Sequence, residues 1–390
     1  MNLIATISPV SAQQAQAVTV LNPLDPNHIT VKRYRLDESG AVVCDAYGNA
    51  SSFYHHQHSI SDVRTLGTLI TTLSARRDAI LIRGLAKPEL HRVASRNNGN
   101  FQEAPAGCQW VMIDFDNLQL PPGLNPTGRD AIEHCVAKLP PEFRCASYFF
   151  QHSSSAGIVT ADGTAYKNKT GLNAHVFFWL DKPIPGNLLA VYLQDCCIDA
   201  GFYDKVRNKG NVPMIRYGVD LSVIKTPVQP HYVGLPIIEA GVTCTLNPTD
   251  RQGLVQKSSD AVVIPLVTPA IERIVAQKHR MLRDDWCREC GYVKVRSVTK
   301  LAGGGVAVST HFANPNAAAR TSSEFLRAEP YGQDDNAIRL YFTDEGTPGS
   351  WYVIKTKPQF AFRFGDGASL HLKELSQGAY EGCGANLQLG

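Results

Sequence analysis

Short apolar runs and longer amphipathic stretches alternate along the first two thirds of the chain. Runs of consecutive apolar, often β-branched residues predict buried strands, and these runs cover residues 79–84, 110–116, 146–152 and 174–180. Stretches in which apolar residues recur every three or four positions predict helices, and these cover residues 61–73, 129–139 and 188–198. Strands and helices in this order predict a layered domain of the α+β or α/β class.

The N-terminal region is more polar and gives weaker signals. Residues 1–30 are polar and rich in proline and asparagine, which predicts a loosely held lead-in. Residues 29–34 alternate between apolar and polar and predict a strand, whereas the polar segment 51–60 predicts a loop. Ser61 is the expected N-cap of the first helix, because its hydroxyl can accept a hydrogen bond from the first turn.

The pattern changes after about residue 250. Thr268 and Pro269 form a good N-cap and first-turn pair for a helix that reaches about Asp285. Beyond this helix the chain breaks into short strand-like pieces separated by turns, at residues 337–342, 351–355 and 360–364. We therefore expect a main domain over residues 1–260 and a smaller accessory domain over residues 268–390.

Composition narrows the class of protein only slightly. The chain has 390 residues and a formal net charge of +3, which permits a nucleic-acid partner without arguing for one. Its ten cysteines, with the adjacent pair Cys196 and Cys197, show no disulfide-framework spacing, so we expect reduced thiols and a cytoplasmic protein. No apolar run reaches membrane-spanning length and the N-terminus lacks signal-peptide features, so we expect no membrane partner.

The apolar run at 110–116 ends in two carboxylates, Asp114 and Asp116. Because strand side chains alternate, both carboxylates point to one face while Ile113 points to the other. Two carboxylates roughly 5 Å apart repel each other by about 3 kcal/mol at an effective dielectric constant of about 20. A divalent cation removes that repulsion, and oxygen ligands suit Mg²⁺ or Mn²⁺. The alternative is that both aspartates lie in solvent at a strand end and cap a turn.

Three later features carry chemistry that fits these carboxylates. His175 lies near the start of the strand at 174–180, and Asp220 follows an apolar strand as a third carboxylate. Lys167 and Lys169 lie in the loop that leads into His175. Taken singly, these residues indicate a core histidine, a turn residue and a solvated hairpin. Taken together they suit nucleotidyl transfer, in which carboxylates hold two cations about 3.5–4 Å apart and basic groups meet phosphate oxygens.

In this order the residues resemble the motifs of the archaeo-eukaryotic primase superfamily, in the primase-polymerase branch of phages, plasmids and integrated mobile elements. That family carries an apolar strand ending in Asp-x-Asp, then a small residue-x-His motif, then an apolar residue followed by Asp. The corresponding segments here are Ile113-Asp-Phe-Asp116, Asn173-Ala-His175 and Val219-Asp220. Further similarity lies in Leu81 to Gly84, His91 to Phe101 and Val228 to Tyr232, so the resemblance covers roughly residues 75–240.

The resemblance implies an α+β fold in which an RRM-like sheet is joined to an α/β N-terminal unit, with a smaller C-terminal accessory domain. It implies a template-directed DNA primase and DNA polymerase that joins dNTPs or NTPs on single-stranded DNA during replication of a mobile element. Residues 1–260 are then the primase-polymerase catalytic domain. Many relatives continue into a helicase, but no Gly-x4-Gly-Lys-Ser/Thr loop occurs here, so we expect a separate replicative helicase as a partner.

The resemblance also implies roles for individual residues. Asp114, Asp116 and Asp220 are then the ligands of two catalytic Mg²⁺ or Mn²⁺ ions. His175 is then the contact to the phosphates of the incoming nucleotide, and the same nucleotide-binding set includes Asn173, Lys167, Lys169 and Arg216. The family usually has serine where this chain has Asn173, so the triphosphate contacts differ there. The residues expected to contact nucleic acid are Arg92, Arg96, Gln229 and His231.

Several alternatives stay open. The basic segment with Lys205, Arg207 and Lys209 extends the nucleic-acid track or is a solvated charged face. The chain could also be a non-catalytic single-strand-binding replication module, or a metal-dependent nuclease built on the same carboxylates. The His-x-His pattern within residues 54–58 suits a nicking enzyme with a tyrosine nucleophile, but it needs an apolar strand where we expect a loop.

Structural zinc is not expected. Cys287 and Cys290 have the spacing of half a zinc site, but no second cysteine pair follows at finger spacing. Only the fold could bring a completing ligand, and the candidates for that are Cys244, His279 and Cys383.

Overall fold

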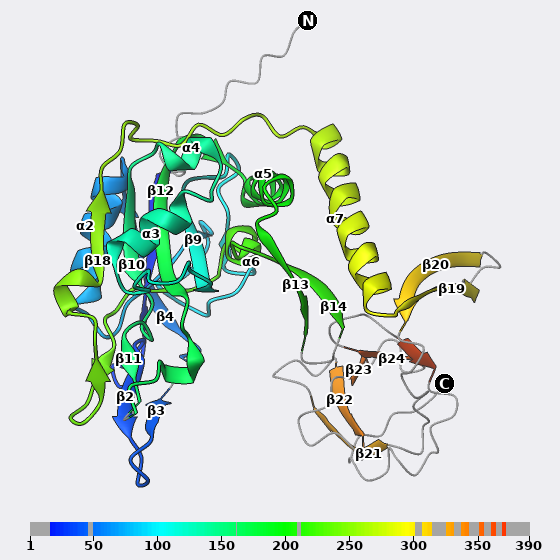
Figure 1. Cartoon of the computed structure of the whole chain (residues 1–390), viewed down its shortest axis with the longest axis horizontal. Helices are drawn as coiled ribbons and strands as arrows, with labels where there is room; N and C mark the ends of the chain where they lie inside the picture. Colours follow the sequence, from blue (N-terminus) through cyan, green and yellow to red (C-terminus); the bar gives the residue numbers. More distant parts are fainter. Residues whose placement is uncertain are drawn as a thin grey trace, which may run out of the picture. The chain divides into compact units, whose positions relative to one another are not determined.

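The computed structural model describes residues 16–45, 50–160, 162–208, 212–300 and 306–313, together with five short strands between residues 325 and 371. The chain forms two compact units (Figure 1). The first unit contains residues 1–204 and 216–280, and the second contains residues 205–215 and 281–390. This division falls inside a long helix, after residue 280, whereas the sequence pattern places the boundary between residues 260 and 268.

Two antiparallel sheets form the framework of the first unit. The five-stranded sheet has the order β15 (His231–Tyr232), β5 (Ile80–Ile82), β1 (Ala17–Pro23), β4 (Phe53–Ser59) and β7 (Val93–Ala94). The four-stranded sheet has the order β18 (Gln252–Val255), β10 (Tyr148–His152), β12 (Leu172–Ile184) and β9 (Cys108–Leu118). Smaller sheets join β16 (Ile237–Ile238), β2 (Arg33–Leu36) and β3 (Val42–Asp45), then β6 (Leu85–Ala86) and β8 (Phe101–Gln102), and β11 (Ile158–Val159) and β17 (Thr243–Cys244).

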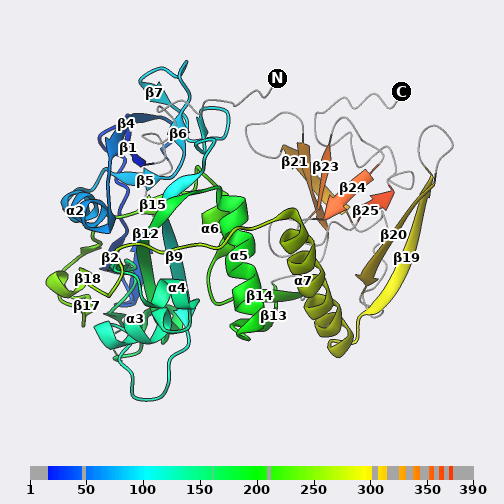
Figure 2. The same ribbon diagram turned by 90° about the horizontal axis from the view of Figure 1, so that it is seen from above.

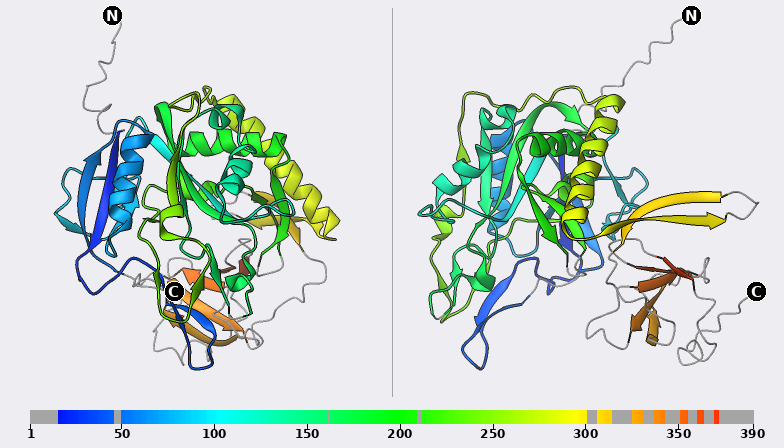
Figure 3. Two further views of the ribbon diagram at one scale, coloured as in Figure 1. Left: turned by 60° about the vertical axis from the view of Figure 1, so that its left-hand side comes forward. Right: turned by 45° about the vertical axis from the view of Figure 1, so that its right-hand side comes forward.

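The helices of the first unit are short. They are α2 (Val63–Ser74), α3 (Arg129–Val136), α4 (Pro141–Arg144), α5 (Gly186–Asp199) and α6 (Leu221–Lys225), with 3-10 turns η1 (Tyr166–Asn168) and η2 (Pro248–Asp250). The α2 helix lies against the five-stranded sheet (Figure 3, left), and α5 and α6 run side by side (Figure 2). None of the described helices combines the length and apolar character needed to cross a bilayer.

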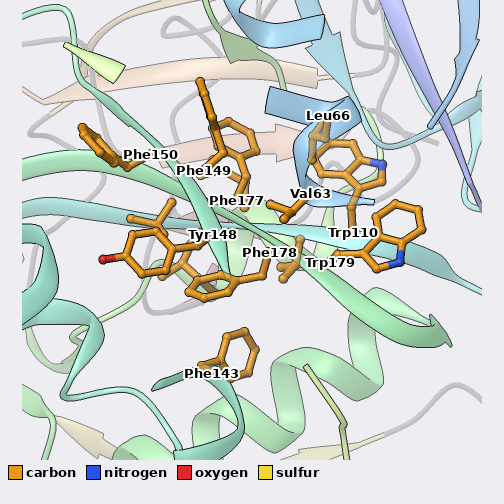
Figure 4. Close-up of a cluster of buried hydrophobic side chains, with 14 of the residues drawn as sticks. Val63, Leu66, Trp110, Phe143, Tyr148, Phe149, Phe150, Phe177, Phe178 and Trp179 are labelled. Atoms are coloured by element: carbon orange, nitrogen blue, oxygen red, sulfur yellow. The ribbon is translucent and has the colours of Figure 1, made fainter. Parts of the chain in front are cut away.

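Both faces of the four-stranded sheet are covered. Phe177 and Phe178 are successive residues of β12 and therefore point to opposite faces. On the Phe177 side, α2 packs so closely that a Cβ on Gly67 would lie 2.5 Å from the ring of Phe149. On the Phe178 side, the ring of Phe143 from α4 meets Phe178 edge to face at 5.0 Å. Figure 4 shows these aromatic side chains gathered in one core.

The Phe178 side also carries α3 and α5. The segment that follows α3 shares one surface depression with α4 and α5, and the hydroxyl of Tyr192 in α5 donates a hydrogen bond to Glu142 in α4 (2.7 Å). His175 lies two residues before Phe177 and therefore points to the Phe177 side of the sheet. Asp114 lies directly opposite His175 in the register. The two polar residues therefore share the face that α2 only partly covers.

The apolar pattern predicts most of these elements correctly. The strands predicted at 79–84, 110–116, 146–152 and 174–180 are β5, β9, β10 and β12, and β9 and β12 run longer than predicted. The helices predicted from residues 61, 129 and 188 are α2, α3 and α5. The strand predicted at 29–34 overlaps β2 only at Arg33 and Tyr34, and the chain is α+β as expected.

The predicted N-terminal lead-in is wrong from residue 17 onward. Ala17–Pro23 forms β1, which pairs with β4 on one side and β5 on the other. Val18 and Leu21 have no exposed surface, and the buried hydroxyl of Thr19 donates to the carbonyl of Gly84 (2.7 Å). A central strand can thus include a polar residue when its hydroxyl is satisfied, and the polar surroundings in sequence concealed this strand.

The predicted loop at 51–60 is also wrong, because Phe53–Ser59 forms β4. All seven of its residues pair with β1, so backbone hydrogen bonds form the strand although His56 and His58 are exposed. The N-cap of α2 is Asp62 and not Ser61. Asp62 accepts from the backbone N–H of Thr65 (2.7 Å) and Thr65 Oγ1 accepts from that of Asp62 (3.1 Å), which closes a capping box.

The helix expected after Thr268 is α7 (Pro269–Glu289), which spans the division between the units. The hairpin of β13 (Tyr203–Arg207) and β14 (Pro213–Tyr217) also spans the division between the units. The second unit contains a hairpin of β19 (Val293–Lys300) and β20 (Val306–Ala313), and a sheet with the order β21 (Phe325–Pro330), β22 (Ala337–Phe342), β23 (Trp351–Ile354), β24 (Phe360–Arg363) and β25 (Ser369–His371). The three predicted strand pieces are therefore β22, β23 and β24.

Candidate functional site

The pairing of β9 with β12 brings together two of the predicted site residues. Asp114 and His175 are direct cross-strand partners, and His175 Nε2 lies 3.6 Å from Asp114 Oδ1. Their side chains are 22% and 18% exposed, so the pair is half-buried but open to a ligand. The cross-strand position of the two residues explains how segments some sixty residues apart in sequence meet at one point.

Asp116 lies at the rim of the same region. Its side chain is 70% exposed, and its Oδ1 accepts a hydrogen bond from Lys169 Nζ at 2.7 Å. Lys169 also donates to Oδ1 of Asn173 at 3.3 Å. The loop before His175 therefore delivers one cation to the second carboxylate of the Asp-x-Asp motif.

A β-bulge shapes the end of β9 beside Asp116. The register with β12 shifts between Phe115 and Leu118, and Asn117 takes a left-handed conformation with φ of 54°. The Asn117 side chain accepts from the N–H of Gly171 (2.9 Å), while the N–H of Asn117 donates to Asn173 Oδ1 (3.1 Å). A Cβ on Gly171 would lie 2.5 Å from the Leu118 carbonyl oxygen, so this approach requires glycine.

Asn173 therefore fixes the strand ends. Its Oδ1 accepts from the Asn117 N–H and from Lys169, and its Nδ2 donates to the carbonyl of Gly171 (2.8 Å). With 4% of its surface exposed, it has little access to a bound nucleotide. The bonds it makes orient Lys169 toward Asp116.

The third predicted carboxylate, Asp220, is the N-cap of α6. Its Oδ1 accepts from the N–H (2.8 Å) and the hydroxyl (2.7 Å) of Ser222. The backbone N–H of Asp220 donates to the carbonyl of Asp114 at 3.4 Å, which joins the start of α6 to β9. Asp220 is thus close enough to Asp114 for its charge to matter, although it does not line the cavity described below.

Burial is the main influence on the Asp114 carboxyl and raises its pKa. The nearby charges oppose each other. His175 lowers this pKa, Asp116 and Asp220 raise it further, and Lys169 lowers it. The carboxylate form of Asp114 is therefore destabilised in the protein alone, and a bound cation would favour it.

A cavity of about 230 Å³ opens onto this region. Six of the residues predicted from sequence border it: Asp114, Asp116, Lys169, His175, Gln229 and His231. The remaining wall comes from Thr30, Val31, Lys32, Met112, Ser153, Ser154, Ser155, Val223, Pro230, Tyr232 and Gly234. Sequence reasoning assigned no role to Ser153–Ser155 or to Lys32. The run of three serines after a buried strand is the signal that could have identified the first of these.

Besides Asn173, two predicted nucleotide-binding residues, Lys167 and Arg216, do not border the cavity. The Lys167 ammonium lies 5.3 Å from the ring centre of Tyr166, and Lys167 itself has a φ of 56°. Arg216, on the exposed face of β14, donates to Asp204 Oδ2 at 2.8 Å. Their proposed roles stay predictions that need movement of these side chains.

Of the four residues predicted to contact nucleic acid, Gln229 and His231 border the cavity, whereas Arg92 and Arg96 do not. Arg92 is exposed and stands 5.5 Å from the ring centre of Tyr54 on β4. Arg96 donates to the carbonyl of Val228 (2.6 Å), so its guanidinium supports the segment that carries Gln229 and His231. Of the basic segment at 205–209, Lys205 pairs with Glu289, and Lys209 lies outside the described residues.

The donor set suits a hard divalent cation, although each carboxylate has a protein partner. Asp114 faces His175, Asp116 faces Lys169 and Asp220 caps α6. In the described part of the chain, no three His, Cys, Asp or Glu side chains are grouped tightly enough to hold a metal ion as they stand. The two carboxylates that share the cavity supply oxygen ligands of the kind that Mg²⁺ and Mn²⁺ prefer.

The half zinc motif gains no partner within the described residues. Cys287 is buried and Cys290 is half-buried, and both are free thiols, as are Cys196 and Cys197. His279 shares a hydrogen bond with the hydroxyl of Tyr217 (2.6 Å). Cys383 lies outside the residues that the structure describes.

Comparison of the chain with protein-family models, with curated proteins and with solved structures finds no match in any of the three.

Proposed function

We propose that this chain is a DNA primase-polymerase, a template-directed nucleotidyltransferase that uses Mg²⁺ or Mn²⁺ in replication of a mobile element. The observation that carries the proposal is the cavity in which Asp114, Asp116, Lys169 and His175 meet. Metal-binding carboxylates and phosphate-binding cations are both needed for nucleotidyl transfer, and here they border one space. A separate replicative helicase and a single-stranded DNA template are the partners that this function requires.

The order of elements in the first unit supports the same proposal. Strands β9, β10 and β12 with helices α3 and α5 follow the succession β-α-β-β-α, apart from the short elements α4, β11 and η1. Three strands in the order β10-β12-β9, with both helices on one side, match an RRM-like sheet. The opposite side of that sheet, which α2 only partly covers, carries Asp114 and His175.

Each residue of the site has a distinct task in this proposal. When bound, two divalent cations supply the charge that activates a 3′-hydroxyl and stabilises the leaving pyrophosphate. Asp114 and Asp116 would hold them, and Asp220 would join from the start of α6. Lys169 then leaves Asp116 and its ammonium meets a phosphate oxygen. His175, released from Asp114, donates from Nε2 to another.

Ser153–Ser155 border the same cavity as Lys169 and would supply hydroxyl donors to the phosphates. The turn at Ser153–Ser155 is held by the buried side chain of Arg251, a residue that is 2% exposed. Its guanidinium donates to the carbonyls of Ser153 (3.4 Å) and Ala156 (3.0 Å). This buried cation adds positive potential at the place where the triphosphate would lie.

One observation reopens the nicking-enzyme alternative. His56 and His58 lie on a strand, β4, and not on the expected loop, and alternation places both on one face. His56 and His58 are exposed and do not border the cavity. We therefore prefer the primase-polymerase hypothesis. The two activities need different residues, which makes them separable by substitution.

A single assay separates the candidates. Labelled primer on single-stranded template is incubated with Mg²⁺ or Mn²⁺, with and without dNTPs, and an unprimed circular strand is tested in parallel with NTPs and dNTPs. Template-dependent extension supports the proposal. Degradation of the primer that needs no dNTPs supports a nuclease, cleavage of the circle supports a nicking enzyme, and metal-independent binding without synthesis supports a single-strand-binding module.

A further inference from the structure

His231 is a buried histidine that borders the cavity and has no hydrogen-bond partner. The residue is 2% exposed, and neither Nδ1 nor Nε2 reaches a donor or acceptor within the described part of the chain. Because a buried polar group without a partner is costly, such groups are rare in folded proteins and each needs an explanation. A ligand that enters the cavity can supply the missing partner.

The fold fixes the backbone around His231. It belongs to β15, which pairs with β5 at the edge of the five-stranded sheet. On one side of it, Arg96 donates to the carbonyl of Val228 (2.6 Å). On the other side, the buried amide of Gln151 donates to the carbonyl of Val233 (2.8 Å). The backbone that carries the imidazole is therefore held on both sides before any ligand arrives.

Burial also fixes the charge of this ring. It lowers the pKa of His231 to about 3, and the nearby charges of His175 and Arg83 act in the same direction. At neutral pH the ring is therefore uncharged and offers one N–H donor and one nitrogen acceptor. Such a ring suits a neutral hydroxyl better than a phosphate, which prefers a cationic partner.

The β9 residue that the His231 ring contacts indicates which part of a nucleotide His231 meets. Its ring packs edge-on against Trp110 at 5.9 Å, whereas the phosphate-binding groups lie at Asp114 and beyond. Alternate residues of a strand are about 7 Å apart, and Trp110 and Asp114 are separated by two such intervals along β9. His231, which contacts Trp110, therefore lies one or two intervals further into the protein than Asp114. In a nucleotide whose phosphates lie against Asp114 and Lys169, the next group inward is the sugar.

We propose that His231 hydrogen-bonds a sugar hydroxyl of the bound nucleoside triphosphate and so determines which sugars the site accepts. This inference rests on the proposed function, because it takes the triphosphate end of the cavity from that proposal. It gives His231 a role in nucleotide selection in place of the nucleic-acid contact predicted from sequence, which its burial does not favour.

The chain provides a matched control in His152. This histidine is also buried (4% exposed), also has two ring nitrogens without a partner, and has a pKa lowered by burial to about 4. It lies on β10 of the same unit but does not border the cavity. Replacement of either ring by phenylalanine keeps the shape and removes the polar atoms.

The test is calorimetric binding of ATP, dATP and 2′,3′-dideoxy-ATP to the full chain with Mg²⁺ and without DNA. We expect the wild type to bind at least one hydroxyl-bearing nucleotide about tenfold more tightly than the dideoxy form. Preference for ATP alone assigns the 2′-hydroxyl, and equal preference for ATP and dATP assigns the 3′-hydroxyl. His231→Phe should bind all three equally while melting no lower than the wild type, and His152→Phe should keep the wild-type preference.

The possible failures are distinguishable. If His231→Phe keeps the wild-type preference, or if the wild type shows none, the inference is overturned while nucleotide binding still supports the proposed function. If the loss of preference occurs equally in His152→Phe, the effect comes from general repacking and the assignment to His231 is overturned. If no triphosphate binds the wild type at all, both the inference and the proposed function are wrong.

Discussion

At the scale of single residues, burial and the neighbouring charges shift the pKa of the Asp114 carboxyl in opposite directions. Burial raises its pKa, and the like charges of Asp116 and Asp220 add to this, whereas His175 and Lys169 lower it. A site that holds a carboxylate under these conditions without a bound cation reduces the stability of the protein alone. This is the behaviour expected of a site shaped for an ion.

We expect Asp114→Asn to raise the melting temperature of the metal-free protein at pH 8. A carboxyl whose folded pKa is raised contributes full stability only below its unfolded pKa of about 3.9, and this contribution is lost as pH rises through the folded value. The difference from the wild type should therefore shrink on acidification toward pH 4, and added Mg²⁺ should stabilise the wild type alone. Equal melting at every pH would contradict this, and Asp181→Asn, an exposed carboxylate on β12, is the control.

The Lys169 ammonium should matter for nucleotide binding and little for folding. Its partner Asp116 is largely exposed, and pairs that solvent screens in this way contribute roughly 0–1 kcal/mol to the free energy of unfolding. We expect Lys169→Met to raise the KM for dNTPs about tenfold or more, because a charge-assisted bond to phosphate is lost. Steady-state extension kinetics measure this, with Lys182→Met as the control, because Lys182 is an exposed residue of β12. An unchanged KM would show that Lys169 only pairs with Asp116.

At the scale of elements, an ion pair joins the strands to the helices that flank the site. Arg83 is buried and bonds to Glu103 and to the carbonyl of Ile224 at the end of α6. Glu103 in turn accepts from the N–H of Gly186 at the start of α5 (3.0 Å), where Pro185 offers no side-chain cap. This pair fixes α6, and with it Asp220, relative to β5 and β6.

We expect Glu103→Ala to lower the free energy of unfolding by about 3–5 kcal/mol, because it leaves the buried Arg83 charge without a partner. Urea unfolding of the metal-free chain measures this. The exposed pair of Arg35 with Asp45 provides the comparison, and Asp45→Ala should cost roughly 1 kcal/mol or less. Similar costs for the two substitutions would show that Arg83 is satisfied by backbone carbonyls alone.

The sequence predicts the elements of the site better than their local geometry. Apolar runs identify β9 and β12, and alternation places Asp114 and His175 on their faces. The bulge at Asn117 could not be predicted, because a one-residue shift in register depends on the partner strand and on Gly171. β1 and β4 were missed for a related reason, since backbone pairing and not apolar content forms β4.

At the scale of the whole molecule, the first unit extends further along the chain than composition suggests. Residues 269–280 of α7 belong to it. Lys278 bonds to Asp195 (2.7 Å) and Asp199 (2.6 Å) of α5. The change in character after residue 250 is therefore a change in local pattern and not the end of the unit.

A chain that ends at residue 292 should therefore melt at a higher temperature than one that ends at residue 268, just before α7. The shorter chain loses α7 and exposes the surface of α5 that Lys278 covers. Thermal unfolding followed by circular dichroism measures the difference. Identical melting temperatures would show that α7 contributes nothing to the first unit.

The most direct test of the central claim is metal-dependent primer extension by carboxylate variants of the full chain. With Mg²⁺ or Mn²⁺ and dNTPs, we expect the wild type to extend a primer on single-stranded template. Asp114→Asn and Asp116→Asn should each lower the rate by about a thousandfold or more while the fold and DNA binding persist, and Asp181→Asn should extend normally. Extension at the wild-type rate by the Asp114→Asn, Asp116→Asn double variant would contradict the account.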